Sequence, residues 1–101
     1  LAHGHEITEQ PADVVVTEPK AAKFFVRANG VEPISYQWWR RDPTMAVPGF
    51  VEIPGATGPS YSLDPTSASR DNRAMFKVTL TDALGRTVES RAAYLKVVRR
   101  R

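Results

Sequence analysis

The chain contains no cysteine among its 101 residues. This absence excludes disulfide bonds, thiol catalysis and zinc–thiolate or iron–sulfur centres, but it leaves the cellular compartment open, because exported proteins can also lack disulfides. Histidine is scarce too, since the sequence holds only His3 and His5. A catalytic triad would need a histidine from the N-terminus, and no Gly-x-Ser-x-Gly motif is present to hold a nucleophile.

Long apolar runs and glycine-rich loops are also missing. No run approaches the roughly 18 apolar residues of a membrane-spanning helix, and no charged-then-apolar start marks a retained signal peptide. No glycine motif suits phosphate binding, and the carboxylates show no spacing that indicates a glycosidase pair. From these absences we expect no enzyme activity, no cofactor, no metal site and no membrane span.

The length and composition are those of one globular domain. Single domains cluster at roughly 100–150 residues, and the content of 42% hydrophobic and 25% charged residues is close to the globular average. The first residue is Leu1 rather than Met, so we expect a processed or excised piece of a larger protein. We expect a flexible tail over residues 1–5, a folded domain over 6–98 and a basic tail over 99–101.

Charge is distributed unevenly along the chain. Residues 70–101 hold nine basic and three acidic side chains, whereas residues 1–35 hold three basic and five acidic ones. The net charge of +3 is too small to indicate a nucleic-acid partner, and no interleaved aromatics stand beside the basic run to stack bases. The run Arg99-Arg100-Arg101 could engage phosphates or anionic lipid headgroups, but we favour a solvated end or the start of a linker.

Proline and glycine divide the chain into short segments. Eight Pro and six Gly residues recur at intervals that leave no room for long helices. The segments between them are rich in β-branched and aromatic residues, which is typical of an all-β sandwich or barrel. We expect strands near residues 5–9, 13–17, 21–28, 34–41, 50–53, 60–64, 74–81 and 87–97. The segment 64–72, rich in Ser, Asp and Thr, could form a short helical turn.

Alternation within these segments predicts which side chains are buried. In the segment 74–81 the apolar Phe76, Val78 and Leu80 alternate with polar residues, so one face is expected to lie in a core and the other in solvent. The four residues from Asp82 to Gly85 then form the clearest turn signal, and they predict a hairpin between antiparallel strands.

Six segments in sequence order carry a family resemblance. They are Gln10–Val16, Ala22–Gly30, Tyr36–Trp38, Ile53–Leu63, Asp71–Gly85 and Ala93–Val97. Together they resemble the strands of immunoglobulin-like (I-set-like) domains, in particular the cysteine-free kind that recurs in bacterial secreted and cell-surface proteins. The resemblance implies an antiparallel β-sandwich of seven to eight strands without a disulfide.

The resemblance also implies a core. Trp38 stands at the core tryptophan, Val26 and Val78 replace the two cysteines of the inter-sheet disulfide, and Phe76 stands where the family has a corner tyrosine. The residues expected in this core are Phe24, Val26, Trp38, Tyr61, Leu63, Phe76, Val78 and Leu95.

One candidate binding surface follows from the same alternation. If Trp38 points inward, then Trp39 and Arg41 point outward. The family layout puts three strands side by side, so the predicted surface consists of Trp39, Tyr94, Arg41, Lys77 and Lys96. Such a surface could bind a glycan or an acidic partner. Alternatively, the aromatic ring after the core tryptophan only shields the sheet and stacks against Arg or Lys stems, and this is the interpretation we favour.

The two histidines offer a weaker candidate. Their spacing would put both imidazoles on one side of an extended strand, where His3, His5 and Glu6 could coordinate zinc or copper. A flexible terminal tail is the simpler interpretation, and we favour it.

The resemblance implies a non-catalytic module of a larger exported or cell-surface protein. Such modules act as structural spacers or dock against neighbouring domains, so we expect other domains as partners and an extracellular or cell-surface location. Two alternatives stay open. One is a glycan- or protein-recognition module that uses the Trp39/Tyr94 surface, and the other is an accessory domain of a secreted enzyme.

Overall fold

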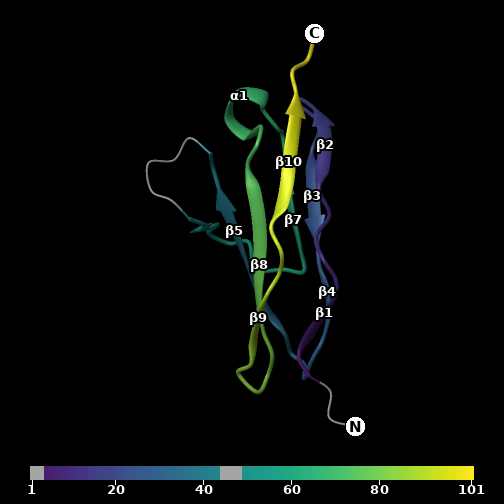
Figure 1. Ribbon diagram of the computed structural model, residues 1–101, viewed down its shortest axis with the longest axis vertical. Helices are drawn as coiled ribbons and strands as arrows, with labels where there is room; N and C mark the ends of the chain where they lie inside the picture. The colour runs from purple at the N-terminus through teal and green to yellow at the C-terminus, as the bar shows by residue number, and fades with distance from the viewer. Residues whose placement is uncertain (1–3, 44–48) are drawn as a thin grey trace.

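A computed structural model describes residues 4–43 and 49–101. These residues form ten short strands and one helical turn (Figure 1). In chain order the elements are β1 (Glu6–Glu9), β2 (Val14–Thr17), β3 (Ala22–Phe25), β4 (Arg27–Asn29), β5 (Ser35–Arg41), β6 (Val51–Glu52), β7 (Ser60–Leu63), α1 (Ala68–Asp71), β8 (Met75–Thr81), β9 (Thr87–Glu89) and β10 (Ala93–Val98). The helical turn lies inside the segment where the sequence indicated one.

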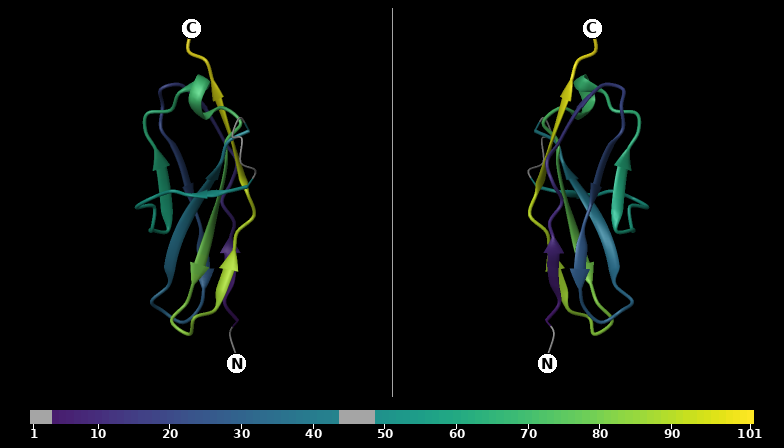
Figure 2. Two further views of the ribbon diagram at one scale, coloured as in Figure 1. Left: turned by 90° about the vertical axis from the view of Figure 1, so that its left-hand side faces the viewer. Right: turned by 90° about the vertical axis from the view of Figure 1, so that its right-hand side faces the viewer.

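The strands form the two layers of a sandwich (Figure 2). The larger sheet has the order β2-β10-β8-β5-β6, with β9 also paired to β8, while the other layer contains the pairs β3-β7 and β1-β4. Among the described strands, β2 pairs with β10 in parallel and the other pairs are antiparallel. The predicted all-β sandwich is therefore confirmed.

Two of the expected strands are each divided in two, which accounts for the higher number of strands. The segment 21–28 breaks at Val26, whose N–H donates to Pro59 O at 3.0 Å, so that β3 pairs with β7 and β4 pairs with β1. The segment 87–97 breaks at Ser90, because the Ser90 hydroxyl accepts the Val78 N–H at 2.9 Å in place of a backbone carbonyl. Alternation alone does not show where a strand changes partner.

Alternating burial on the strands builds one core. Along β8, Phe76, Val78 and Leu80 are buried, and the residues between them are partly exposed. Of the residues expected in the core, six are buried, and two, Tyr61 and Leu63 of β7, are partly buried and pack against it. The six buried ones are Phe24, Val26, Trp38, Phe76, Val78 and Leu95.

Aromatic rings join the two layers. Phe24 of β3 stacks on Phe76 of β8 with ring centroids 4.7 Å apart, and Tyr61 of β7 lies 5.7 Å from Phe76 and 6.4 Å from Trp38. Such pairs add stabilisation beyond the apolar area that they bury. Trp38 is fully buried, and its indole Nε1 donates to Gly58 O at 2.8 Å.

Trp38 also anchors the crossing between the layers. Its backbone N–H donates to Ala56 O at 2.9 Å, and its carbonyl accepts the Ile53 N–H at 3.0 Å. Together with the indole bond to Gly58, these contacts hold the segment 53–58, which leads from the larger sheet to β7 (Figure 2).

The turn between β8 and β9 is the expected hairpin. The Asp82 carboxylate accepts the N–H groups of Leu84 and Arg86 at 3.1 and 2.9 Å, and Arg86 Nε donates to it at 2.8 Å. Gly85 closes the turn with φ of +81°, a conformation that glycine adopts at low cost. Burial of the carboxylate raises the pKa of Asp82, but the hydrogen bonds and charge of Arg86 and the backbone N–H groups outweigh it, and the pKa falls from 3.8 to about 2.

Replacement of Trp38 is expected to cost a large share of the stability. Trp38→Ala should lower the free energy of unfolding by about 3–5 kcal/mol, because it leaves a cavity and removes the bond to Gly58, out of a total of roughly 5–15 kcal/mol. Urea denaturation followed by circular dichroism measures this loss. The exposed Leu84→Ala should change stability by under about 0.5 kcal/mol, and equal effects of the two substitutions would contradict the core assignment.

The Asp82 carboxylate predicts an acid-sensitive fold. Because its pKa is lower in the folded than in the unfolded chain, its contribution is complete above about pH 4 and is lost as the pH falls towards about 2. In Asp82→Asn, the decline of unfolding free energy over this range should be shallower than in the unmodified protein. The exposed Asp64→Asn is the control and should leave the decline unchanged. Parallel curves for Asp82→Asn and the unmodified protein would contradict the assignment.

Candidate functional site

The outer face of the larger sheet brings together four of the five predicted surface residues. Trp39 lies directly opposite Lys77 in the β5–β8 register, and Arg41 and Tyr94 lie on either side of Met75. These side chains alternate with the buried residues of β5, β8 and β10, as the sequence predicted.

Contacts within the chain occupy the polar groups of this face. Trp39 Nε1 donates to Thr79 Oγ1 at 3.1 Å, and Lys77 Nζ lies 3.2 Å from a Glu89 carboxylate oxygen. The Lys77 ammonium also lies 4.5 Å from the centroid of the Phe50 ring, a cation–π contact. The sequence analysis did not single out Phe50 or Glu89, because their contacts depend on the pairing of strands. What this face offers a partner is mainly Arg41 and Tyr94, which is 40% exposed.

Lys96 lies on the same face of β10, two residues after Tyr94. It lies opposite Val15 of β2, at a point where β10 extends beyond the first residue of β8. Alternation predicted which face Lys96 occupies but not its distance along the strand. A binding role for the five residues stays a prediction.

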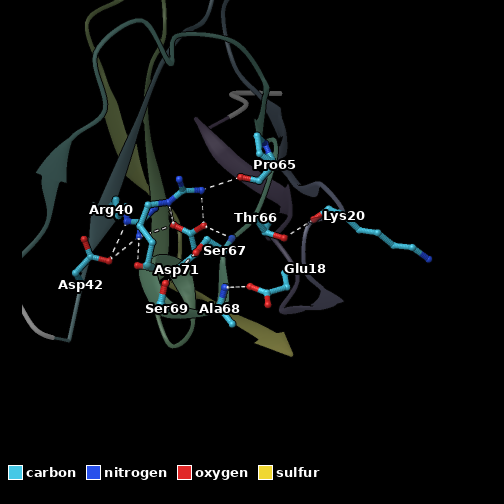
Figure 3. Close-up of polar contacts among 11 residues, drawn as sticks. Glu18, Lys20, Arg40, Asp42, Pro65, Thr66, Ser67, Ala68, Ser69 and Asp71 are labelled. Carbon is cyan, nitrogen blue, oxygen red and sulfur yellow. Dashed lines mark hydrogen bonds and ion pairs between the residues drawn. The ribbon is translucent and has the colours of Figure 1, made fainter. Parts of the chain in front are cut away.

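A buried carboxylate, Asp71, organises the polar cluster at the α1 end of the sandwich (Figure 3). Its Oδ1 accepts hydrogen bonds from Arg40 Nη2 and Arg70 Nε, both at 2.9 Å. Its Oδ2 accepts from Arg70 Nη2 at 2.7 Å and from the Ser67 N–H at 2.8 Å. Arg40 also donates from Nε and Nη2 to Asp42, at 3.0 and 2.8 Å, and its guanidinium lies 5.5 Å from the centroid of the Phe76 ring.

The pKa shifts of Asp71 and Arg40 both favour the charged forms. Burial raises the pKa of Asp71, but the bonds from Arg70, the Ser67 N–H and Arg40 outweigh it, so the pKa lies below its ordinary value. The pKa of Arg40 is raised, because its bonds to Asp42 and Asp71 outweigh the opposing effect of burial. Such a network suits a structural role rather than proton transfer. By strand alternation Arg40 points to the same side as Trp38. A charged residue at an inward position needs a buried partner, so this feature of the sequence could have indicated the cluster, but the sequence analysis did not use it.

A second carboxylate, Glu18, joins three segments beside this cluster. Its Oε1 accepts the Ala68 N–H of α1 at 2.7 Å, and its Oε2 accepts the Arg100 N–H at 3.1 Å (Figure 3 shows the first bond). These two backbone bonds, in that order, lower the pKa of Glu18. The chain after β10 is therefore held against α1 and the end of β2.

His5 packs against the sandwich. Its ring nitrogens lie 3.0 Å from Asn29 O and 3.1 Å from Leu80 O, so both face backbone carbonyls. His3 lies outside the described residues, and the boundary between tail and domain stays a prediction. In residues 4–43 and 49–101 no group of three or more His, Asp or Glu side chains is placed to hold a metal ion. No helix of the same residues is long and apolar enough to cross a membrane.

Loss of the buried carboxylate of Asp71 is expected to destabilise the fold more than loss of the partly exposed carboxylate of Asp42. Asp71→Ala should lower the free energy of unfolding by about 3–5 kcal/mol, because it leaves Arg40 without its buried counter-ion. Asp42→Ala removes the other carboxylate from the same arginine but leaves Arg40 its fully buried partner Asp71, so the loss should be clearly smaller. Chemical denaturation of both variants measures the difference, and equal losses would show that burial of Asp71 is not what matters.

No protein-family model matches the sequence, and no curated protein matches it. Solved structures do. The N-terminal Ig1-2 module of the Drosophila receptor protein tyrosine phosphatase DLAR is 24% identical, with a TM-score of 0.67 over 97% of this chain and 50% of that chain. An I-band fragment of titin is 16% identical, with a TM-score of 0.70 over 97% of this chain and 34% of that chain.

The titin M3 domain is 16% identical, with a TM-score of 0.65 over 94% of this chain and 97% of that chain. This chain therefore spans half of the receptor module and nearly all of the single titin domain. At such identities the likeness concerns the fold, and the bacterial origin that the sequence resemblance implied stays a prediction. Its two layers, its buried Trp38 and these structural neighbours together show that the chain has the immunoglobulin-like fold.

Proposed function

We propose that the chain is a non-catalytic module of a larger protein and acts as a rigid spacer between neighbouring domains. The observation that carries this proposal is the shape. The body measures 54 × 26 × 20 Å, and the strands nearest the two ends of the chain, β1 and β10, lead to opposite ends of its long axis (Figure 1). Domains attached at these ends would be held apart by the length of the sandwich.

Contacts at both ends support a fixed direction of entry and exit. At one end β1 pairs with β4, and His5 lies against Asn29 and Leu80. At the other end Glu18 holds the Arg100 backbone beside α1. A spacer transmits distance only where the chain leaves the folded body without a flexible joint, and these contacts support that condition.

The perturbed carboxylates also suit a structural module. Glu18, Asp71 and Asp82 have lowered pKa values because each accepts hydrogen bonds that hold a turn or a chain segment. General acids and bases instead need pKa values near the working pH. The similar titin fragment and receptor module are longer than this chain, which fits a unit within a larger protein.

The location and partners of this module are predictions. We propose neighbouring domains as its partners and an exported or cell-surface protein as its parent, as the sequence resemblance implies. A recognition role is a second candidate, favoured by the exposed Tyr94 ring on the same face as Trp39 and Arg41. The role of an accessory domain in a secreted enzyme stays a further alternative.

The spacer proposal is tested by inserting the chain between a donor and an acceptor fluorescent protein. Single-molecule energy transfer should give one narrow distance distribution, whereas a Gly/Ser linker of the same length should give a broad one. A broad distribution for the folded chain would exclude a rigid spacer. Trp39→Ala should leave the distance unchanged, and if this variant instead loses retention on a polysaccharide or a partner while folded, the recognition role replaces the spacer.

A further inference from the structure

Five exposed cations belong to segments at the C-terminal end of the sandwich. They come from three separate places in the chain, namely the turn after β2, the residue pair after α1 and the segment after β10. We call them the basic end, and they are Lys20, Arg73, Arg99, Arg100 and Arg101. Sequence position alone joins only the last three.

Backbone contacts bring these segments together. The Lys20 carbonyl accepts the Thr66 hydroxyl at 2.6 Å beside α1 (Figure 3), and the Arg73 N–H donates to Leu95 O of β10 at 2.9 Å. Glu18 then accepts the N–H groups of both Ala68 and Arg100. Glu18 thus positions the arginine run beside α1 and beside the turn that contains Lys20.

The charge of the basic end is only partly offset inside the protein. Within residues 4–43 and 49–101, none of its five side chains makes a hydrogen bond or an ion pair at contact distance. The Glu18 carboxylate, which accepts two backbone N–H groups, interacts with the charges of Arg99 and Arg100, and Asp64 is exposed nearby. Five cations against these two acids leave an excess of positive charge, which attracts an oppositely charged partner and steers its approach.

The opposite end of the molecule carries the opposite sign. Glu6 pairs through its backbone with Asn29, and the turn that contains Glu32 contacts the β8–β9 hairpin through the bond from the Ala83 N–H to Val31 O. Both glutamates are exposed. Arg86 at this end is already paired with Asp82. The two ends of the 54 Å long axis therefore carry charges of opposite sign.

We propose that the basic end docks the domain end-on to a membrane surface rich in anionic lipid. Cations on three segments at one end of the 54 × 26 × 20 Å body suit contact with a plane, whereas a linear polyanion suits a groove or stripe. The exposed Val98 directly before the arginine run favours a lipid interface over a purely ionic polymer. The acidic opposite end would be repelled by the same surface, which orients the long axis away from it.

Vesicle sedimentation tests the proposal with the unmodified 101-residue protein. We expect binding to phosphatidylcholine vesicles that contain phosphatidylserine, no binding to pure phosphatidylcholine, and release as salt rises, since charges are screened over about 10 Å at 0.1 M salt. Arg99→Gln with Arg100→Gln should weaken binding about tenfold or more. Arg27→Gln with Arg91→Gln is the control of equal formal charge. It removes two exposed cations elsewhere, of which Arg27 is ion-paired with Glu9, and should have a much smaller effect.

A third variant tests whether Glu18 positions the arginine run. In Glu18→Gln one acceptor oxygen becomes an NH₂ group, which cannot accept the N–H that it faces. This variant raises the net charge by one, so simple charge attraction would strengthen binding, whereas loss of the positioned arginine run should weaken it. Thermal unfolding confirms that the variant is folded, and stronger binding by the folded variant would refute the positioning role of Glu18.

Three outcomes would overturn membrane docking. They are equal losses in the two double variants, equal binding to vesicles with and without phosphatidylserine, and retention on heparin without binding to anionic vesicles. The last would assign the basic end to a soluble polyanion instead. A neighbouring domain attached after Arg101 would share this end with the membrane. The vesicle results therefore test the basic end of the 101-residue chain, and the energy-transfer distances test the spacer.

Discussion

Contact between aromatic rings of the two layers is the constraint on which the rest of the structure depends. The sandwich has no disulfide, so the contacts of Phe76 with Phe24 and Tyr61, and of Tyr61 with Trp38, are the means by which the facing layers are joined. Trp38 adds a directional element, because its indole and backbone bonds hold the crossing segment 53–58. A core of this kind must be well packed, since large apolar residues replace a covalent link.

Buried charge performs a second structural task at the α1 end. Both carboxylate oxygens of Asp71 accept hydrogen bonds, from Arg40 and Arg70. Among the described residues, every buried side-chain nitrogen or oxygen atom has a hydrogen-bond partner. At the same end the Glu18 carboxylate accepts backbone N–H groups. The acidic side chains at this end therefore bind groups of the protein itself, whereas the cations of the basic end are exposed. The difference in charge between the two ends thus results from which groups the fold pairs, rather than from the net charge of the chain.

The sequence predicted the sandwich, the hairpin after Asp82 and the inward residues well, because these depend on local alternation and turn chemistry. It did not predict the division of two strands at Val26 and Ser90, since a strand changes partner for reasons that lie on other strands. For the candidate surface, alternation predicted the face, but the register between the strands decided that Lys96 lies opposite Val15 of β2, beyond the first residue of β8. The engagement of Lys77 by Glu89 and Phe50 was equally hidden.

By itself, the amino-acid order determined an all-β module with a core around Trp38 and a basic final segment, because periodicity and composition act along the chain. Only the tertiary structure decided that Glu18 positions the arginine run, that Lys20 and Arg73 lie at the same end, and that Asp71 is buried among arginines. The physical reason is that hydrogen bonds and ion pairs depend on distances of a few ångströms between segments that are far apart in sequence.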